Sequence, residues 1–551
     1  MPMAGLNRMR RRAVPGVVAC MVALAACSSG NDGSGAGSPA PDASTSSAGA
    51  AGDRTLTLAI GGEPEDGYDP TLGWGRYGSP LFQSTLLARD ADLNVVNDLA
   101  TGYTVSEDGL VWTVTIRDDA VFTDGEPVTT ADVAYTFNTA AQSGGLTDVT
   151  VLDEAVAIDE TTVELHLQRP RSTFVNRLIS LGIVPEHAHG DGYARDPIGS
   201  GPFQLVRWDE GQQLIVDRND AYYGAQPAFE RIVFLFTDED GSLAAARAGA
   251  VDMVAVPSTL ATGELAGMRL VEVPSIDNRG MMLPYGRDEG ATTQGGAPIG
   301  NDVTADVAIR QALNLAVDRT ALVDGVLEGF GSPAYGPVDG LPWFEPSSAV
   351  ADGDPDAARV VLEEAGWVAD AGDVRSKDGL AARFRLLYPA GDTIRQGLAL
   401  SVADMVRPVG IDIEAVGASW QEIEQGMHAD AVLFGWGSHD PTEMYNLYHS
   451  SQAGVEYWNP GFYDNEQIDE YLDLAMSAPD QDEANVYWRA AQLDEDGRGF
   501  GAPADAAWAW LVNLDHTYYV GDCLDIGSPQ IEPHGHGWPI TAGIASWRWT
   551  C

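Results

Sequence analysis

The chain has 551 residues and a formal net charge of −50 at pH 7, because 81 acidic residues outweigh 31 basic ones. Such a surface repels nucleic acid and favours cationic partners, and it also keeps a protein soluble outside the cell. Lys377 is the only lysine in the chain. A phosphate-binding P-loop is therefore excluded, because its motif requires a lysine after the glycines.

The N-terminus has the pattern of a targeting segment. Arginines at positions 8, 10, 11 and 12 precede an apolar run from Ala13 to Ala26 that is too short to span a membrane. We therefore predict a signal peptide over residues 1–26. The run ends in "LAAC", which looks like a bacterial lipobox, so cleavage would leave Cys27 as a lipid-carrying N-terminus. The alternative is an ordinary cleavage site after small residues.

Residues 27–53 are rich in Gly, Ser and Ala and contain almost nothing that a folded core would bury. We expect a flexible tether between the lipid and the folded protein. About 500 residues follow the tether, and this is more than one hydrophobic core usually organises, so we expect at least two lobes.

The four cysteines predict one disulfide. Cys20 leaves with the signal peptide and Cys27 carries lipid, so the folded protein keeps Cys523 and Cys551. Two remaining cysteines usually pair outside the cytoplasm, and a bridge here would fix the C-terminal segment. The alternative is two free thiols.

The first predicted elements alternate between strand and helix. "RTLTLAIGG" (54–62) has the period of a strand, and "SPLFQSTLLARD" (79–90) begins with a Ser-Pro helix start. A strand over 111–116 follows, then a turn at Asp124-Gly125. Thr129 stands three residues before Asp132, which predicts a capped helix.

The rest of the chain continues as a mixed α/β sequence without an internal repeat. A second, helix-rich part begins near residue 290, and "AAWAWLVNL" (506–514) is predicted to be a buried strand that returns to the first sheet. Further strands are predicted in "TTVELHLQ", "FQLVRW", "QLIVDRN" and "RIVFLF", and further helices in "DGSLAAARAG", "VAIRQALNLAVDRTALVDGVL", "DPDAARVVLEEAGW" and "RQGLALSVADMVRPVG".

Five segments carry a family resemblance, and together they span nearly all of residues 55–515. They are "SEDGLVWTVTIRDDAVFTDGEPVTTADVAYTF", "DPIGSGPFQLVRWDEGQQLIVDRNDAYYG", "VAIRQALNLAVDRTALVDGVLEGFGSPA", "DPDAARVVLEEAGW" and "GWGSHDPTEMYNLYHS". In these segments the chain resembles family 5 of the bacterial extracellular solute-binding proteins. Members of that family are lipoproteins that deliver peptides, nickel chelates or opines to ABC importers.

The resemblance implies a periplasmic-binding-protein type II fold of the α/β class. Two lobes are joined by two crossovers and close over ligand like a hinge. Lobe one would comprise residues 54–285, with an inserted subdomain at about 85–195; lobe two would comprise 286–507, and 508–551 would return to lobe one.

The resemblance also implies a monomer that performs no chemical reaction. Its partners would be a small-molecule or peptide ligand and the permease and ATPase subunits of an ABC importer. It would contact the outer face of the cell membrane through its lipid alone and would bind no nucleic acid.

"GWGRYG" (73–78) matches the G-x-G-x-x-G pattern of dinucleotide sites. That pattern requires a strand directly before it, and "YDPT" does not have the pattern of a strand. One alternative is a ligand-facing loop in which Trp74, Arg76 and Tyr77 offer aromatic faces and a cation. The other is glycine-rich packing between strand and helix.

"GSHD" places Ser438, His439 and Asp440 side by side, which resembles the residue list of a hydrolase. Triad members normally converge from separate parts of a fold, so this run does not predict an enzyme. In the family, the corresponding segment follows a strand of lobe two and faces the cleft. The resemblance therefore implies Trp436, His439 and Asp440 as ligand-binding residues, with Asp440 either pairing the α-amine of a peptide or capping the next helix.

"PHGHGWP" (533–539) holds His534 and His536 on a segment that its glycines and prolines exclude from a helix. Side chains two residues apart point the same way on an extended chain, so both imidazoles can reach one metal ion. Imidazole suits nickel, copper and zinc, and the sequence alone does not select among them. The family resemblance suggests nickel, because some nickel-chelate members carry histidines on a C-terminal loop.

We therefore expect a nickel complex with a small chelator such as histidine, which the lobes would enclose. His534 and His536 would be metal ligands, His439 a third ligand or a contact to the chelator, and Trp74, Tyr77 and Trp436 the walls. The alternative is an oligopeptide. A secreted zinc hydrolase would need a third ligand and a general base that the spacing does not identify.

Overall fold

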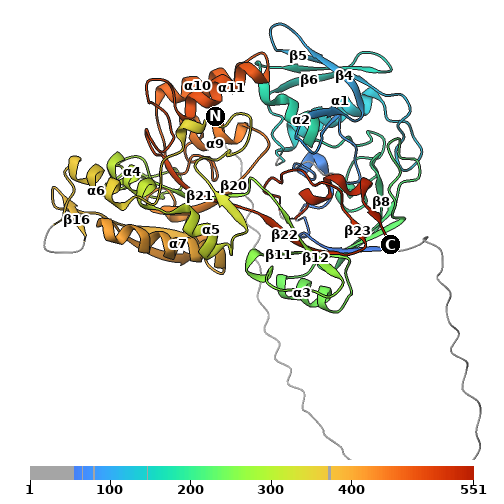
Figure 1. Cartoon of the computed structure of the whole chain (residues 1–551). Coiled ribbons are helices and arrows are strands. Elements are labelled where there is room, and N and C mark those ends of the chain that lie inside the picture. The colour runs from blue at the N-terminus through green and yellow to red at the C-terminus, as the bar shows by residue number, and fades with distance from the viewer. Residues whose placement is uncertain (1–54, 65, 78–80, 146, 370–373, 536) are drawn as a thin grey trace, which may run out of the picture. The chain divides into compact units, whose positions relative to one another are not determined.

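The computed structural model describes residues 55–64, 66–77, 81–145, 147–369, 374–535 and 537–551 (Figure 1). The predicted signal peptide (1–26), the lipid site Cys27 and the tether (27–53) lie outside the described residues, and so does His536. No helix in the described ranges is long and apolar enough to cross a membrane.

The first sheet belongs to lobe one and has seven strands in the order β12-β22-β11-β1-β10-β9-β8. The central strand β1 runs parallel to both neighbours, and its Leu56 and Leu58 are fully buried, as the alternating pattern predicts. Helix α3 (Glu239–Arg247) connects β10 to β11. The strands are β1 (Leu56–Ala59), β8 (Phe203–Asp209), β9 (Gln213–Arg218), β10 (Arg231–Leu235), β11 (Met253–Val256), β12 (Met268–Val273) and β22 (His516–Gly521).

A subdomain is inserted between β1 and β8. It holds a four-stranded sheet in the order β4-β5-β7-β6, which helix α1 covers. Thr129 and Asp132 form the predicted capping box at the start of α1. The elements are β2 (Leu87–Arg89), β3 (Val95–Asn97), β4 (Ala100–Val105), β5 (Val111–Ile116), α1 (Thr130–Ser143), β6 (Leu152–Ala157), β7 (Thr162–Leu167) and α2 (Val175–Ser180).

The helix predicted over residues 79–90 is not present in the described part of that segment, which contains β2 instead. Ser84 Oγ donates a hydrogen bond to the carbonyl oxygen of Ser200, and the N–H of Leu99 donates to the carbonyl oxygen of Thr85. Pairing with distant segments has therefore overridden the local helix-start signal.

The second sheet belongs to lobe two and has six strands in the order β14-β21-β13-β20-β18-β19. Strands β18, β19 and β20 are parallel and are connected by α7 and α8. The predicted helix over 307–327 is split at Val317, and Asp318 caps the second half. The strands are β13 (Asn278–Met282), β14 (Gly331–Pro333), β18 (Arg383–Pro389), β19 (Asp412–Ala418), β20 (Ala431–Trp436) and β21 (Trp508–Leu514).

Helices pack on this sheet around two apolar clusters. They are α4 (Val307–Ala316), α5 (Arg319–Val326), α6 (Pro355–Glu364), α7 (Thr393–Val406), α8 (Trp420–Gly426), α9 (Thr442–Tyr448), α10 (Glu466–Ser477) and α11 (Gln481–Gln492). Two small sheets complete the fold, formed by β15 (Val368–Ala369), β16 (Arg375–Lys377) and β17 (Leu380–Ala381), and by β23 (Leu524–Asp525) and β24 (Arg548–Trp549).

The chain passes between the two sheets twice. The first crossover (274–277) joins β12 to β13, and the second, at Asp515, joins β21 to β22 (Figure 1). The "AAWAWLVNL" strand was expected in the first sheet, but as β21 it lies in the second, and β22 is the strand that returns. A fully buried apolar run suits the centre of either sheet, so its sequence does not specify its partner.

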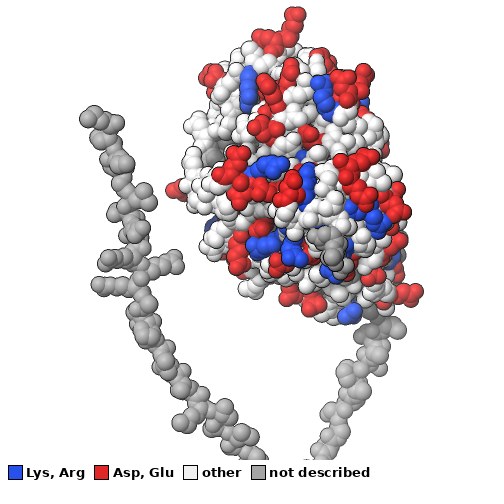
Figure 2. Space-filling view, turned by 90° about the vertical axis from the view of Figure 1, so that its left-hand side faces the viewer, with Lys and Arg blue, Asp and Glu red and all other residues white. Residues whose placement is uncertain are grey.

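The surface is acidic, and Asp and Glu side chains are spread over the face seen in Figure 2, with arginines among them. Several arginines of the chain form exposed ion pairs, such as Arg231 with Asp217 at 2.6 Å and Arg383 with Asp412 at 2.6 Å. Exposed pairs of this kind contribute little to stability, about 0–1 kcal/mol each.

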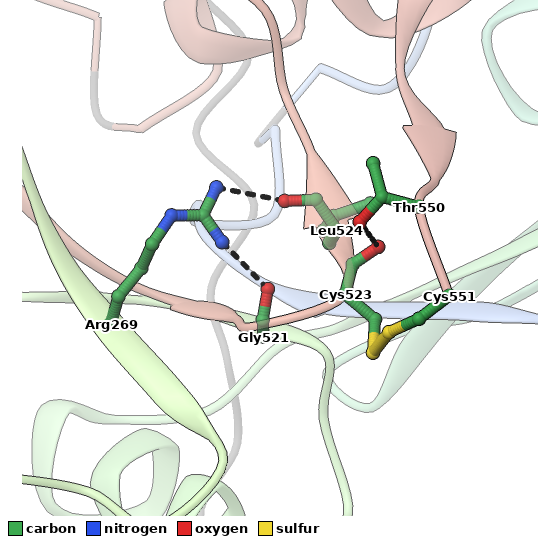
Figure 3. The surroundings of a disulfide bond; sticks show 6 residues. All are labelled: Arg269, Gly521, Cys523, Leu524, Thr550 and Cys551. Carbon is green, nitrogen blue, oxygen red and sulfur yellow. Dashed lines mark hydrogen bonds between the residues drawn. A yellow bond between two sulfur atoms is a disulfide. The ribbon is translucent and has the colours of Figure 1, made fainter.

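The C-terminal segment is fixed by covalent and polar contacts. Cys523 and Cys551 form a disulfide, and β23 pairs with β24 beside it (Figure 3). Arg269 of β12 donates hydrogen bonds of 2.8 Å to the carbonyl oxygens of Gly521 and Leu524. The chain around this disulfide is thus held against the edge of the first sheet.

The same C-terminal segment joins both crossovers through Glu532. The backbone of Glu532 pairs with the first crossover, because the N–H of Ile276 donates to its carbonyl oxygen at 2.9 Å and its own N–H donates to Pro274 at 2.9 Å. Its buried carboxylate accepts hydrogen bonds from His516 Nδ1 at 2.5 Å and from the hydroxyl of Tyr518 at 2.8 Å. His516 directly follows the second crossover.

Asp277 lies in the first crossover and completes this group, which we call the hinge cluster (Asp277, His516, Glu532 and His534). Asp277 accepts hydrogen bonds from Arg279 Nη1 at 2.5 Å, His534 Nδ1 at 2.9 Å and His516 Nε2 at 3.4 Å. Burial alone would raise the pKa of Asp277, but the charges of Arg279 and His534 hold it well below its usual value. Burial alone would lower the pKa of His516, but its bonds to Asp277 and Glu532 raise it to about 10.

The hinge cluster predicts how stability depends on pH. Because the folded pKa of His516 is raised from 6.5 to about 10, its contribution is complete below about pH 6.5 and is lost as the pH rises toward 10. The contribution of Asp277 is present above about pH 4 and is lost below it. We expect the unfolding temperature of wild type to exceed that of His516→Gln most between about pH 4 and 6.5.

Calorimetric unfolding of both proteins from pH 4 to 10 measures this difference, which should shrink steadily above pH 6.5. Comparing the two proteins cancels other groups, such as Glu443, whose pKa burial raises to about 8. His166→Gln is the matched control, because this histidine is half-buried on β7 and lies outside the hinge cluster. A wild-type advantage that stays flat from pH 6.5 to 10 would contradict the assignment.

Candidate ligand site

Three parallel strands of lobe two end at the same edge of the second sheet. Helix α7 follows β18, α8 follows β19, and the loop 437–441 follows β20. Ligands of open α/β sheets bind outside the carboxyl ends of such strands. Arg395 in the first turn of α7, Trp420 at the start of α8 and Trp436 at the end of β20 all lie at this edge.

A cavity of about 290 Å³ lies at this edge. Its size is at the lower limit for small-molecule pockets, so it has room for one ring-sized group rather than a whole peptide. The lining residues are Arg395, Trp420, Phe434, Gly435, Trp436 and Tyr457.

The aromatic walls of the cavity support one another. The ring of Trp420 lies 6.4 Å from Phe434 and 5.8 Å from Tyr457 between centroids, and Phe434 lies 6.3 Å from Tyr457. Trp436 stacks on Trp458 at 4.6 Å. Aromatic pairs at these separations contribute about 0.5–1.5 kcal/mol each beyond the area they bury, so the walls are held in place without ligand.

Two guanidinium groups converge beside the cavity, and Gly435 makes their approach possible. A Cβ atom on Gly435 would lie 2.6 Å from Arg279 Nη1 and 2.8 Å from Arg395 Nη2, closer than a real side chain tolerates. Arg395 also pairs with Asp392, and Arg279 pairs with Asp277. Burial and then the charge of Arg279 lower the pKa of Arg395, which marks the cost of bringing two cations together.

Three buried nitrogen atoms at this place find no hydrogen-bond partner among the residues that the structure describes. They are Arg279 Nε, Arg395 Nε and Trp436 Nε1. All three are donors in every protonation state these side chains adopt in proteins. Buried polar groups are normally satisfied, so these three donors are exceptions within the fold.

The loop after β20 carries the predicted residues His439 and Asp440. Asp440 Oδ2 accepts a hydrogen bond of 2.8 Å from Arg177 of α2, and Asp440 Oδ1 accepts one of 2.9 Å from the N–H of Thr442 at the start of α9. The carbonyl oxygen of His439 accepts a hydrogen bond of 3.1 Å from Arg89. In this structure Asp440 therefore binds the first backbone N–H of α9 and pairs with Arg177 of the inserted subdomain.

The imidazole of His439 is neutral and buried. Burial, and then the charge of Arg89, lowers the pKa of His439 to about 3. Its Nε2 is buried and has no hydrogen-bond partner within the described ranges.

The aromatic side chains of the "GWGRYG" loop have different surroundings. Trp74 is buried, with ring centroids 4.8 Å from Tyr68 and 5.1 Å from Trp538, so it packs in the core of lobe one; its role as a ligand wall stays a prediction. Arg76 donates to the hydroxyl of Tyr77 at 2.9 Å, and the Tyr77 ring lies 6.3 Å from that of His534. The loop follows a 3-10 turn, Pro70–Leu72, and so lacks the strand that a dinucleotide site requires.

His534 is tied to the first crossover and to lobe two. Its Nδ1 donates to Asp277, and its backbone N–H donates to the carbonyl oxygen of Gly437 at 2.8 Å. The predicted partner His536 lies outside the described residues. Within the part of the chain that is described, no group of three or more His, Cys, Asp or Glu side chains is arranged to hold a metal ion.

The sequence predicts Trp436 as a ligand-binding residue but does not single out Arg395, Trp420 or Tyr457. Arg395 lies in a segment predicted only as a helix, and Trp420 lies just after a strand that was not predicted. The available signal was the order of elements: a strand followed within four residues by a helix start occurs at both places. Residues in such turns lie at the carboxyl edge of a parallel sheet.

The chain resembles characterised proteins over most of its length. It is 34% identical to Protein XP55 of Streptomyces lividans, covering 88% of each chain. It is 26% identical to the oligopeptide-binding protein AppA of Bacillus subtilis, covering 79% of this chain and 85% of AppA. It is 25% identical to the nickel-binding periplasmic protein of Escherichia coli, covering 75% of this chain and 81% of that one.

Solved structures share the fold. NikZ of Campylobacter jejuni in complex with Ni(L-His) superposes with a TM-score of 0.73 at 21% identity, covering 90% of this chain and 99% of NikZ. AppA of Bacillus subtilis in complex with a nonapeptide superposes with a TM-score of 0.69 at 23% identity, again covering 90% and 99%. The predicted α/β fold of this type is thereby confirmed.

Family membership follows from the central part of the chain. Residues 94–457 match the family described as bacterial extracellular solute-binding proteins, family 5 Middle. The family binds solutes, which agrees with the prediction that the chain is not an enzyme. The chain therefore belongs to family 5 of the bacterial extracellular solute-binding proteins.

Proposed function

We propose that this protein is the substrate-binding component of an ABC importer and that its ligand is a short peptide. The observation that supports a peptide is the cavity at the carboxyl ends of β18, β19 and β20, where aromatic walls adjoin two guanidinium groups. A peptide presents apolar side chains and carboxylate or carbonyl oxygens together, and these are the groups that such a cavity accepts. The likeness to AppA points the same way.

The N-terminal part of the chain supports an anchored receptor. Cys27 would carry lipid, and residues 28–53 would tether the folded part to the outer face of the cell membrane. The protein would then hold ligand close to the permease and ATPase subunits of its importer, which belong to other chains. A single lipid-modified N-terminus is the only membrane attachment in this proposal.

Closure of the lobes would use contacts between the inserted subdomain and lobe two. The Arg177–Asp440 ion pair spans 2.8 Å with both side chains 14% exposed. Ser172 donates to the carbonyl oxygen of Ala475, and Thr442 donates to Thr173 at 2.9 Å. We call these three contacts the interlobe latch.

A nickel chelate is the second candidate, and His439 is the observation that favours it. Metals bind the neutral form of imidazole, and His439 is held in that form with Nε2 unpaired among the described residues. In this alternative His534 and His536 would supply further ligands, and a small chelator such as histidine would complete the coordination. The structural likeness to NikZ extends to the fold alone.

Calorimetric titration with short peptides tests the peptide proposal. Residues 28–551, titrated with peptides of two to nine residues, should bind at least one set with a dissociation constant in the micromolar range or tighter, about −8 kcal/mol. Saturation should raise the unfolding temperature, because a ligand at 100 times its dissociation constant adds about 2.7 kcal/mol of stability. Absence of both binding heat and thermal shift for all peptides would contradict it.

Titration with nickel plus L-histidine tests the second candidate. If the metal assignment is correct, His534→Ala combined with His536→Ala should weaken nickel binding at least tenfold, as should His439→Ala. His166→Ala on the exposed face of β7 is the matched control. Nickel affinity that stays the same in these variants, or no nickel binding by wild type, would exclude these histidines as ligands.

Substitutions in the interlobe latch should weaken ligand binding by favouring the open form. Asp440→Asn removes the charge but keeps a side-chain oxygen for the N–H of Thr442, and Arg177→Met removes the partner. We expect each to lower peptide affinity about three- to tenfold, and the double variant to lose less than the sum.

Small-angle scattering of the ligand-bound protein should show a larger radius for both single variants than for wild type. The control is Arg207→Gln, which breaks an exposed ion pair with Asp209 in lobe one. Unchanged affinity and radius in the Arg177 and Asp440 variants would show that the pair does not stabilise closure.

A further inference from the structure

Glu443 is a buried carboxyl group to which the proposed function assigns no role. It lies in the first turn of α9 and is 8% exposed. Its Oε2 accepts a hydrogen bond of 3.2 Å from the N–H of Gly437, whereas its Oε1 is buried and has no partner among the residues that the structure describes. Glu443 therefore holds the loop 437–441 through one oxygen and leaves the other unpaired.

Gly437 is the residue at which this loop meets the hinge. Its φ is 145°, and a Cβ atom there would lie 2.2 Å from the carbonyl oxygen of Ile276 and 3.0 Å from the Cα of Asp277. Only glycine allows the first crossover to approach so closely. The carbonyl oxygen of Gly437 also accepts the N–H of His534. Glu443 thus binds the backbone at a point that both the first crossover and the C-terminal segment contact.

Two other carboxylates lie close to Glu443. Asp277 packs against Gly437, and the carbonyl oxygen of Asp440 accepts the N–H of Glu443 at 3.1 Å. Both carboxylates are already bonded to basic side chains, which are Arg279 and His534 for Asp277 and Arg177 for Asp440. A negative charge on Glu443 would therefore stand beside two anions and compete with them for the same partners.

The neutral form of Glu443 is favoured at this place. An ionised carboxylate has two oxygens that need donors, and burying one of them without a donor is unfavourable. Burial raises the pKa of Glu443 to about 8, the hydrogen bond from Gly437 opposes the rise, and the charges of Asp440 and Asp277 add to it. A glutamate in water is ionised at neutral pH, so the buried Glu443 differs from it by one bound proton.

Two tyrosines complete the set of titratable groups around Glu443. Tyr448 lies on α9, and its hydroxyl accepts a hydrogen bond of 2.9 Å from Trp510. Burial raises the pKa of Tyr448, and the charge of Glu443 adds to the rise. Tyr77 comes from lobe one: burial raises its pKa, Arg76 opposes the rise, and the charge of Glu443 again adds to it. Lobe one therefore contributes to the surroundings of Glu443.

Separation of the lobes would expose Glu443 to water. Tyr77 belongs to lobe one, and Arg177, which holds Asp440, belongs to the inserted subdomain. Both would leave when the lobes part, because Glu443 and Asp440 stay with lobe two. Water would then hydrate the carboxylate, and the pKa of Glu443 would return toward its ordinary value of 4.5.

We propose that Glu443 is a positioning residue that links closure of the lobes to the uptake of one proton. The closed form holds a neutral carboxyl group that binds Gly437 and keeps the loop 437–441 in place, and the open form releases the proton. This loop carries Asp440 of the interlobe latch, so the proton stabilises the contact between lobe two and the inserted subdomain. The inference goes beyond the proposed function, because it holds for any solute that the lobes enclose.

The bound proton predicts the direction of a pH dependence. Because the pKa of Glu443 is raised from 4.5 to about 8, closure has its full support below about pH 4.5 and loses it as the pH rises to about 8. Within this range the ratio of closed to open molecules should fall by about tenfold per pH unit at most, since one proton is involved. Above about pH 8 the ratio should no longer depend on Glu443.

Small-angle scattering and hydrogen exchange of the ligand-free protein test this link. Residues 28–551 of wild type and of Glu443→Gln are compared at equal pH across the range in which the proton is released, about pH 5 to 8.5. Glutamine keeps the size of the side chain and an oxygen for the N–H of Gly437 but binds no proton. With rising pH, wild type should show a larger radius of gyration and, relative to Glu443→Gln, faster exchange in residues 436–443.

Asp515 supplies the matched control, because it lies at the second crossover and titrates in the same range. Burial and then a hydrogen bond with Glu272 raise the pKa of Asp515 to about 7. If Glu443 is the source of the pH dependence, Asp515→Asn should keep the behaviour of wild type. Thermal unfolding checks that each variant folds.

Two results would overturn the proposal. One is an equal pH dependence in wild type and Glu443→Gln. The other is a wild-type radius that stays the same throughout the range, and this result does not require the variant to fold. Because no ligand is added, neither outcome depends on whether the protein binds a peptide or a nickel chelate.

Discussion

The buried carboxylate of Glu532 is the constraint on which the arrangement of both lobes depends. A charge removed from water costs several kcal/mol unless it is paired and hydrogen-bonded, and Glu532 bonds His516 beside one crossover and the hydroxyl of Tyr518. Its backbone is at the same time paired with the other crossover. The two connections between the lobes, 239 residues apart at Ser275 and Leu514, therefore share one neighbour in the C-terminal segment. Both crossovers are thus bonded to the C-terminal part of the chain, in which a disulfide joins Cys523 and Cys551.

Local signals predicted local structure well. The spacing of Thr129 and Asp132 predicted the start of α1, and the period-two pattern of residues 111–116 predicted β5, because both signals depend on atoms within a few residues. The sheet that a strand joins depends instead on segments far away in the sequence. The strand 508–514 is buried on both faces, and nothing in its side chains distinguishes the first sheet from the second. The overall fold came from family resemblance, which carries the long-range information that periodicity lacks.

The site was harder to predict for the same reason. His534 looked like half of a metal site because its neighbours in sequence include another histidine. Asp277, its partner in the structure, is 257 residues away in sequence, so the carboxylate that binds its Nδ1 could not be inferred from spacing. Trp436 was identified because the family resemblance extends through its segment. Arg395 belongs to the same cavity but was counted only as part of a helix, since its role depends on three strands ending at one edge of the sheet.

The end of β20 connects ligand and closure within a few residues. Trp436 forms part of the cavity. The N–H of Gly437 donates to the buried Glu443, and the carbonyl oxygen of Gly437 accepts a hydrogen bond from His534. Asp440 pairs with Arg177 of the inserted subdomain. A backbone held at so many points cannot shift at one of them without affecting the others, because packed interiors move between discrete arrangements rather than deforming continuously. A ligand group that contacts Trp436 therefore acts on the same short segment that carries Asp440 of the interlobe latch. The loop from Trp436 to Asp440 thus joins a wall of the cavity to a contact between lobe two and the inserted subdomain.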